Sequence, residues 1–172
     1  MHTLLVLTII GRDRPGLVSA VSEVIAAHGG NWLDTRMATL AGQFAGMLLV
    51  EIAPDKADAL AGALKALEAK GLRLVVERGV DAAPVAGRML RLDLVGHDRP
   101  GIVRDISSAL AAHNVSIDEL ESEQVSGSFS GEAMFKAWAR LKVPDDVDVD
   151  KLRASVEALA DELMVDLELD EA

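Results

Sequence analysis

The chain has 172 residues, half of them hydrophobic, and it contains no cysteine. Its formal net charge of −11 argues against attachment to DNA or to anionic lipid through its overall field. The lack of cysteine excludes disulfides, thiolate catalysis and cysteine-bound zinc, and it fits the reducing cytoplasm.

The first segment, MHTLLVLTII, predicts a strand, because Leu5, Leu7 and Ile9 alternate onto one face. Its apolar run is too short to cross a bilayer, and it lacks the basic start and the cleavage site of a signal peptide. We therefore expect a cytoplasmic protein that does not associate with membranes.

A charged turn, GRDRPG at Gly11–Gly16, follows this strand. Apolar residues then recur at helical spacing from Leu17 to Ile25, and this pattern ends near His28, before two glycines. A β-rich stretch over 32–52, a helix with Leu60, Leu64 and Leu67, and a strand over 72–77 complete the first half.

The same order returns 85 residues later, where GHDRPG occupies Gly96–Gly101. We predict a strand over 90–94, a helix over 102–110, a β-rich stretch over 117–143 with a hairpin tip at 126–131, a helix over 152–163 and a strand over 165–170. The duplicated β-α-β-β-α-β order predicts an α+β protein of two ferredoxin-like units in tandem, each with an antiparallel sheet and both helices on one face. We place the first domain at residues 1–80, a linker at 81–87 and the second domain at 88–172.

The repeated turn shares its glycine spacing with nucleotide phosphate loops. The lysine and hydroxyl residue of those loops are replaced by Leu17-Val18 and Ile102-Val103, so nucleotide hydrolysis is not expected. Gly16 and Gly101, interpreted as residues within the first helical turn, predict that a strand or a ligand packs closely against bare backbone there. The unpaired N–H groups of such a helix start would suit a carboxylate.

The sheet face that carries no helix differs between the halves. On the first strand it is predicted to carry Leu4, Val6 and Thr8 in the first half, but Met89, Arg91 and Asp93 in the second. We expect Leu48, Val50 and Ile52 of the third strand to share the apolar face of the first half. Such a face predicts contact with a partner or a second copy, and the alternative is that both faces of this sheet are buried within the chain.

The doubled DRPG, followed in each half by a helix and then by AAHGGNWLD or AAHNVSIDEL, resembles the ACT domain family. Two copies without an attached enzyme resemble its glycine cleavage system transcriptional repressor group. The resemblance implies a regulatory module that binds an amino acid between two such units and needs no cofactor. The ligand-binding residues that it implies are Asp13, Arg14, Pro15, Gly16, Asn31 and Asp34 in the first half, and Asp98, Arg99, Pro100, Gly101 and Ser116 in the second.

Ser116 stands where the first half has Asn31, and a hydroxyl offers fewer hydrogen bonds than an amide. We therefore expect the first half to hold the better ligand site. No metal site is expected, because no second ligand lies at a suitable spacing from His28 or His113.

The sequence favours a non-catalytic regulatory protein that senses an amino acid. It would act on a transcription factor or metabolic enzyme through protein contact, in the regulation of glycine cleavage, and could form homo-oligomers. Direct binding of nucleic acid is not expected, because neither half has a helix-turn-helix pattern and the chain is acidic. Two alternatives stay open: a small enzyme or nucleotide-binding protein that uses the paired loops, and a structural adaptor without a ligand.

Overall fold

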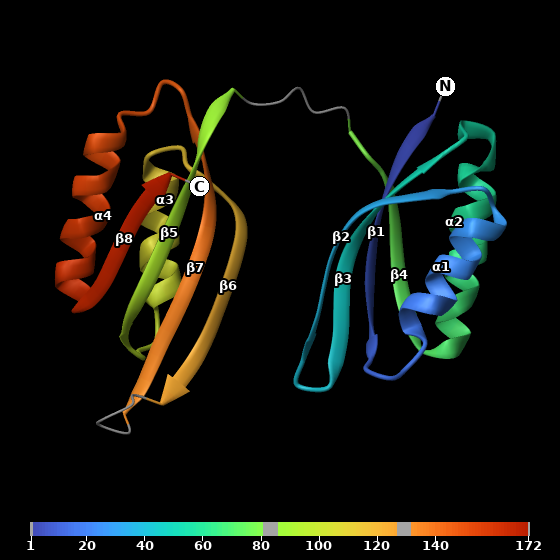
Figure 1. Cartoon of the computed structure of the whole chain (residues 1–172), viewed down its shortest axis with the longest axis horizontal. Helices are drawn as coiled ribbons and strands as arrows, with labels where there is room; N and C mark the ends of the chain where they lie inside the picture. Colours follow the sequence, from blue (N-terminus) through green and yellow to red (C-terminus); the bar gives the residue numbers. More distant parts are fainter. Residues whose placement is uncertain (1, 81–85, 127–131, 172) are drawn as a thin grey trace. The chain divides into compact units, whose positions relative to one another are not determined.

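The computed structural model describes residues 2–80, 86–126 and 132–171, and the chain divides into two compact units, Met1–Ala82 and Ala83–Ala172 (Figure 1). Each unit has the order β-α-β-β-α-β, which confirms the predicted α+β fold of two ferredoxin-like units in tandem. Most of the predicted linker (81–87) and of the predicted hairpin tip (126–131) lies outside the described residues.

The first unit forms a four-stranded sheet with two helices on one face (Figure 1). Its strand order is β2-β3-β1-β4, and neighbouring strands are antiparallel. Its elements are β1 (Thr3–Arg12), α1 (Leu17–Ala27), β2 (Asn31–Leu40), β3 (Gln43–Ile52), the 3₁₀ turn η1 (Pro54–Lys56), α2 (Ala57–Lys65), the 3₁₀ turn η2 (Ala66–Lys70) and β4 (Leu72–Arg78).

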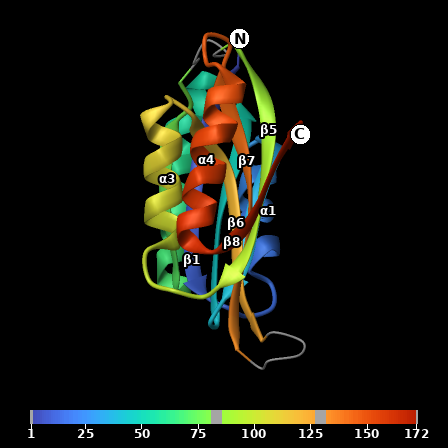
Figure 2. The same cartoon turned by 90° about the vertical axis from the view of Figure 1, so that its left-hand side faces the viewer.

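The second unit repeats this topology with the strand order β6-β7-β5-β8, again antiparallel throughout. Figure 2 shows α3 and α4 side by side on one face of this sheet. The elements are β5 (Gly87–His97), α3 (Ile102–Ala112), β6 (Ser116–Ser126), β7 (Ala133–Pro144), α4 (Val149–Leu163) and β8 (Val165–Glu171).

Each unit buries its own core between its sheet and its helices. The predicted alternation of the first strand is confirmed, since Leu5, Leu7 and Ile9 are at most 2% exposed. On α1, Leu17, Val21 and Ile25 form the buried stripe. No polar or charged residue is buried among the described residues, so apolar packing alone fills both cores.

The open face of the first sheet is apolar, but the prediction for its third strand was wrong. Leu48, Val50 and Ile52 are at most 2% exposed and belong to the core beneath the helices. The open face instead carries Met47 and Leu49, which pair with Thr8 and Val6 of β1. Because side chains alternate with a period of two, an error of one residue moves a whole strand to the other face.

The open face of the second sheet is polar, as predicted for β5. The Arg91 guanidinium lies 4.8 Å from the ring centroid of Trp138, and the Trp138 indole N–H donates to Glu121 at 3.0 Å. Arg91 also donates to Asp93 at 2.6 Å, and this hydrogen bond raises the pKa of Arg91 above its ordinary value. The polar groups of this face therefore satisfy one another.

Helix α4 has a side-chain cap, and its removal should destabilise the second unit. The Asp148 carboxylate accepts from the backbone N–H groups of Lys151 at 3.2 Å and Asp150 at 3.1 Å. These hydrogen bonds lower the pKa of Asp148, and the bond from the Lys151 N–H has the largest effect. The stabilisation is therefore fully present above the carboxyl pKa of the unfolded chain and is lost as pH falls through the lower folded pKa.

We accordingly expect Asp148→Ala to reduce the free energy of unfolding at neutral pH, because the first turn of the helix loses its acceptor. The difference from the parent, measured by urea denaturation, should shrink below about pH 4. Asp145→Ala, at an exposed position before the helix, is the control. A difference that stays constant down to about pH 2 would contradict the assigned role of the charge.

Candidate functional site

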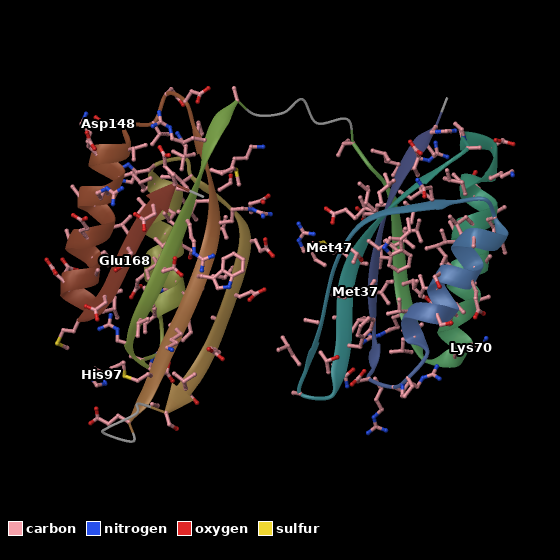
Figure 3. All side chains as sticks on the ribbon, viewed as in Figure 1. Met37, Met47, Lys70, His97, Asp148 and Glu168 are labelled. Atoms are coloured by element: carbon pink, nitrogen blue, oxygen red, sulfur yellow. The ribbon has the colours of Figure 1, made fainter. Side chains whose placement is uncertain are left out.

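The first charged turn is hydrogen-bonded on one side to the tip of the β2–β3 hairpin and on the other to the end of η2. The Asp13 N–H donates to the Gly42 carbonyl at 3.0 Å, at the tip of the β2–β3 hairpin. The Arg14 guanidinium donates to the Lys70 carbonyl at 2.6 Å, at the end of η2. The turn is thereby fixed at one end of the unit, where Figure 3 labels Lys70.

The second charged turn is held by different side chains. The Asp98 N–H donates to the Ala133 carbonyl at 3.0 Å, and the Asp98 carboxylate accepts from the Gln124 amide at 2.5 Å. Arg99 points back toward the helix, with its guanidinium 3.6 Å from the Asp105 carboxylate. The two copies thus share a backbone path but present different groups.

The last glycine of each turn is required by its backbone conformation. Gly16 has φ +88° and Gly101 has φ +99°, in the left-handed region that favours glycine, and each is the N-cap of the following helix. A Cβ on Gly16 would have no atom within 4 Å. On Gly101 the nearest atoms to such a Cβ are those of the Arg104 guanidinium, at 3.0 Å, so no strand packs closely against either glycine. The expectation that these glycines lie within the first helical turn was wrong, because both precede the helix. Close approach of a ligand stays a prediction.

The close approach occurs at the first glycine of each turn. A Cβ on Gly11 would lie 2.8 Å from the Gly71 carbonyl oxygen, and a Cβ on Gly96 would lie 2.7 Å from Cβ of Val165. Both glycines sit at the point where the first strand pairs with the start of the last strand. The bracketing glycines therefore have two separate structural functions.

The helix starts behind the turns have no side-chain cap in the described residues. A glycine N-cap offers no oxygen, so the first N–H groups of α1 and α3 are available to a ligand or to water. Their surroundings differ in charge, because the first turn of α1 contains no acidic residue and that of α3 contains Asp105. Residues Arg12–Gly16 are all exposed. The charge of Asp105 is balanced by Arg104 at 2.7 Å and Arg99 at 3.6 Å, so both helix starts can receive an anion.

The structure does not bring all predicted ligand-binding residues of a unit together. In the first unit, Arg12 pairs with Gln43 and Asn31 pairs with Glu51, at opposite ends of β3. The two pairs are eight residue steps apart along β3, a span of roughly 26 Å. Asp34 lies near the Asn31 end and accepts from Arg36 at 2.7 Å.

The second unit shows the same separation. His97, at the start of the charged turn, pairs with Met134, whereas Ser116 pairs with Lys142 at the other end of β7. Figure 3 labels His97 at the turn end of this unit. A small ligand therefore cannot contact both the turn and the start of the second strand within one unit.

Two groups near the turns were missed by sequence reasoning, the Lys70 carbonyl and the Gln124 amide. Neither follows a local pattern, and Gln124 lies beside Asp98 because β7 pairs with both β5 and β6. His28, by contrast, hydrogen-bonds the Val24 carbonyl at 2.8 Å, as expected of a histidine at a helix end.

In the described part of the chain, no group of three or more His, Asp or Glu residues is placed so that it could hold a metal ion. Within the same residues, no helix has both the length and the apolar character that crossing a bilayer requires.

Models of the ACT domain match residues 3–77 and 90–161 of this chain. The glycine cleavage system transcriptional repressor of Escherichia coli K12 is 24% identical over 163 residues, which cover 92% of this chain and 85% of that protein. A crystal structure of an unknown protein from Galdieria sulphuraria matches with a TM-score of 0.89 and 27% identity, covering 100% of this chain and 99% of that one. A crystal structure of a candidate glycine cleavage system transcriptional repressor matches with a TM-score of 0.70 and 20% identity, covering 99% and 97%.

Proposed function

Because both halves of this chain belong to the ACT domain family, we propose that it is a non-catalytic, cytoplasmic regulatory protein that binds an amino acid. It passes this signal by protein contact to a transcription factor or metabolic enzyme. The likeness to a glycine cleavage repressor over 92% of the chain supports a role in the regulation of glycine cleavage. The structural observation that carries the proposal is the duplicated helix start, left without a side-chain cap by a left-handed glycine.

The ligand carboxylate would bind at the N-terminus of α1. The N–H groups of the first turn and the positive end of the helix favour an anion there. The turn Asp13–Gly16 supplies the wall of this site, and the Asp13 carboxylate is an exposed acceptor for an ammonium group. The α1 site should bind more tightly than the α3 site, because the amide of Asn31 offers more hydrogen bonds than the hydroxyl of Ser116 at the matching position.

A second copy of the chain would complete the site with its Asn31 and Asp34. Within their own unit Asn31 lies roughly 26 Å and Asp34 roughly 20 Å from the turn, so one unit cannot supply both halves of the site. Asn31 is exposed at the start of the edge strand β2, where an amide can both donate to and accept from a ligand. In the second unit, the turn Asp98–Gly101 of one copy and Ser116 of another would form an equivalent site with lower affinity for the ligand.

Calorimetry of the full chain with each free amino acid tests this proposal, with ATP and GTP as negative controls. Asn31→Ala should weaken binding at least tenfold, on the order of one lost hydrogen bond to a charged group, and Ser116→Ala should change it less than about twofold. Gly16→Val should also abolish binding, because it strains the left-handed turn and fills the space in front of the N–H groups.

A mixing experiment separates a shared site from a site within one copy. A dimer of Gly16→Val or of Asn31→Ala has no site at parent affinity, but a mixed dimer has one intact turn opposite one intact Asn31. An equal mixture should therefore recover about one site in four. Recovery of no sites would refute the shared site, and failure of every amino acid to bind to the parent would favour the adaptor without a ligand.

The chain itself should not recognise DNA, and any effect on transcription would pass through the partner. Its net charge of −11 opposes every phosphate contact. Electrophoretic mobility shift assays with the purified protein, at low and at high salt, measure its affinity for DNA. Tight, salt-sensitive binding to a specific duplex would contradict the proposal.

A further inference from the structure

The open face of the first sheet carries large apolar side chains that its own unit leaves exposed. Met47 and Val75 are 54% and 56% exposed, and Ile10 is 37% exposed. Met47 lies on the side of the sheet away from α1 and α2 (Figure 3). Val6 and Leu49, which pair with each other on the same face, are half-buried. A contiguous apolar patch of this kind marks a contact surface.

The second unit shows that the fold itself does not require an apolar open face. The two sheets have the same strand register, so their positions can be matched one by one. The positions that match Val6, Thr8, Met47, Leu49 and Val75 carry Arg91, Asp93, Trp138, Arg140 and Glu168. Arg91 and Arg140 are ion-paired on that face, which therefore suits contact with water. The apolar face of the first unit reflects what it contacts.

The size of this face suits one side of a dimer interface. Its four strands have seven to ten residues each. At a strand spacing of about 4.8 Å and a rise of about 3.3 Å per residue, the face measures roughly 19 by 30 Å. Protruding side chains raise its accessible area toward the roughly 800 Å² that each partner buries in a standard interface.

Two such faces can stack with aligned strands about a two-fold axis in two ways. An axis parallel to the strands sets β2 of one copy over β4 of the other, at the same level. Arg73 would then lie over Ala38 of the second copy, and Glu77 over its Asp34. The Asp34 carboxylate already accepts from Arg36 at 2.7 Å. This arrangement therefore gives neither Arg73 nor Glu77 a partner of opposite charge.

An axis across the strands sets each strand over its own copy, running in the opposite direction. The faces overlap most when this axis crosses the middle of the strands, in the row that contains Thr8 and Val75. Arg73 and Glu77 lie two positions on either side of Val75, so each lies over the other residue of the second copy. Both are exposed, and in the described part of the chain neither makes a hydrogen bond or an ion pair. The dimer would pair both charges twice over.

The same axis matches apolar side chains of different volume. Leu49 lies over Ala45 of the second copy, because the two residues are equally far from the axis. Val6 lies over Ile10 for the same reason. Met47 lies in the axis row and meets its own copy, and a flexible methionine can fill the gap between two twisted sheets.

The polar residues of β2 are compatible with this arrangement. Arg36 lies in the axis row, and the carboxylate of Asp34 in the same copy balances its charge. At the start of β2, Asn31 lies over Leu40 of the second copy. Leu40 belongs to the hairpin whose tip accepts the Asp13 N–H. Asn31 of one copy therefore approaches the charged turn of the other.

We propose that two copies of the chain dimerise by stacking the open faces of their first sheets, about a two-fold axis that crosses the strands at Thr8. The occupant of the apolar face is thus the same face of a second copy. The dimer forms without ligand. Its use of Asn31 to complete the amino-acid site of the other copy rests on the proposed function, whereas the dimer does not.

Sedimentation equilibrium of the full chain without ligand tests the apolar contact. Met47→Glu should weaken the dimer at least a hundredfold, because it removes two buried side chains and sets two carboxylates against each other on the axis. Met164→Glu, the same change at a position of the second unit that is 79% exposed, is the matched control and should leave the dimer unchanged. A parent that is monomeric at millimolar concentration, or a parent dimer that Met47→Glu does not weaken, would overturn the proposal.

Charge exchange tests the direction of stacking. Arg73→Glu and Glu77→Arg should each weaken the dimer about tenfold, because two ion pairs become two repulsive contacts. The double variant should recover the parent affinity. Since the two residues lie roughly 13 Å apart on one strand, this recovery cannot arise within one copy. An equal mixture of the two single variants should likewise form a heterodimer with the affinity of the parent.

The alternatives give distinct results. If Glu77→Arg tightens the dimer, the axis runs along the strands and the proposal fails. If the parent dimer responds to none of these changes, another surface forms it and the proposal also fails. Dimerisation with all the expected responses, but without binding of any amino acid, would uphold this inference while refuting the proposed sensing function.

Discussion

Gly96→Ala is expected to destabilise the second unit by about 1–3 kcal/mol, because the added methyl group overpacks a rigid neighbour. A Cβ there would overlap Cγ1 of Val165 and lie 3.0 Å from the Val165 Cα. Val165 is 8% exposed, and its branched side chain has little rotamer freedom with which to move aside. Urea denaturation of the full chain measures the loss.

Val165→Ala should rescue part of this loss, since it removes the nearest methyl group. The double variant should therefore be more stable than the sum of the two single changes predicts. Gly11→Ala is the comparison in the first unit, where the nearest atom is the backbone oxygen of Gly71 at 2.8 Å. No side-chain substitution can relieve that contact. Additive losses in the Gly96 and Val165 pair would show that the overlap is not the cause.

Leu48→Ala is expected to destabilise the first unit by about 2–5 kcal/mol, the usual range for a buried leucine that leaves a cavity. Leu48 is 1% exposed and packs in the first core, to which only residues of the first unit contribute. Hydrogen exchange should show lost protection in β1 and β3. The amides of the second unit should keep theirs.

The reciprocal change, Ala139→Leu in the second unit, should cost little or stabilise by up to about 1 kcal/mol. Ala139 occupies the position that matches Leu48 in the strand register, and it lines an apolar hollow of about 30 Å³ between α3 and β6 that can accept part of the added side chain. In the first unit, Met37 of β2 packs against the core on this side of the sheet. A loss as large as that of Leu48→Ala would show that the hollow cannot accept a leucine. Thermal unfolding of the two variants beside the parent measures the contrast.

The order of elements could be predicted from the sequence because it depends on local periodicity. The alternation of Leu5, Leu7 and Ile9, and the helical spacing that follows each DRPG, need no knowledge of distant residues. The repeat strengthened the prediction, since strand, turn and helix recur together. It was harder to predict which side chains of each strand face the helices. The phase of β3 follows from its register with β1, and the sequence provides no turn that sets this register, so Leu48 was placed on the wrong face.

The candidate site could be predicted only in part. The turns Asp13–Gly16 and Asp98–Gly101 stand before helices because proline, glycine and the following apolar stripe define a helix start in the sequence itself. The distance from these turns to Asn31 could not be predicted. It arises because α1 runs back along the sheet, so that β2 begins at the end of the unit remote from the turn.

The sequence by itself thus determined a duplicated α+β unit, two glycine-bracketed turns and an acidic, cysteine-free chain. Only the tertiary structure showed which neighbours crowd Gly11 and Gly96 and which face of each sheet a strand residue occupies. It also showed that the second unit has a hollow where the first has Met37. The physical reason is that these features depend on the summed volumes and the register of strands and helices far apart in the chain. Local sequence patterns show which residues are apolar, but they do not show which residues contact one another in the folded chain.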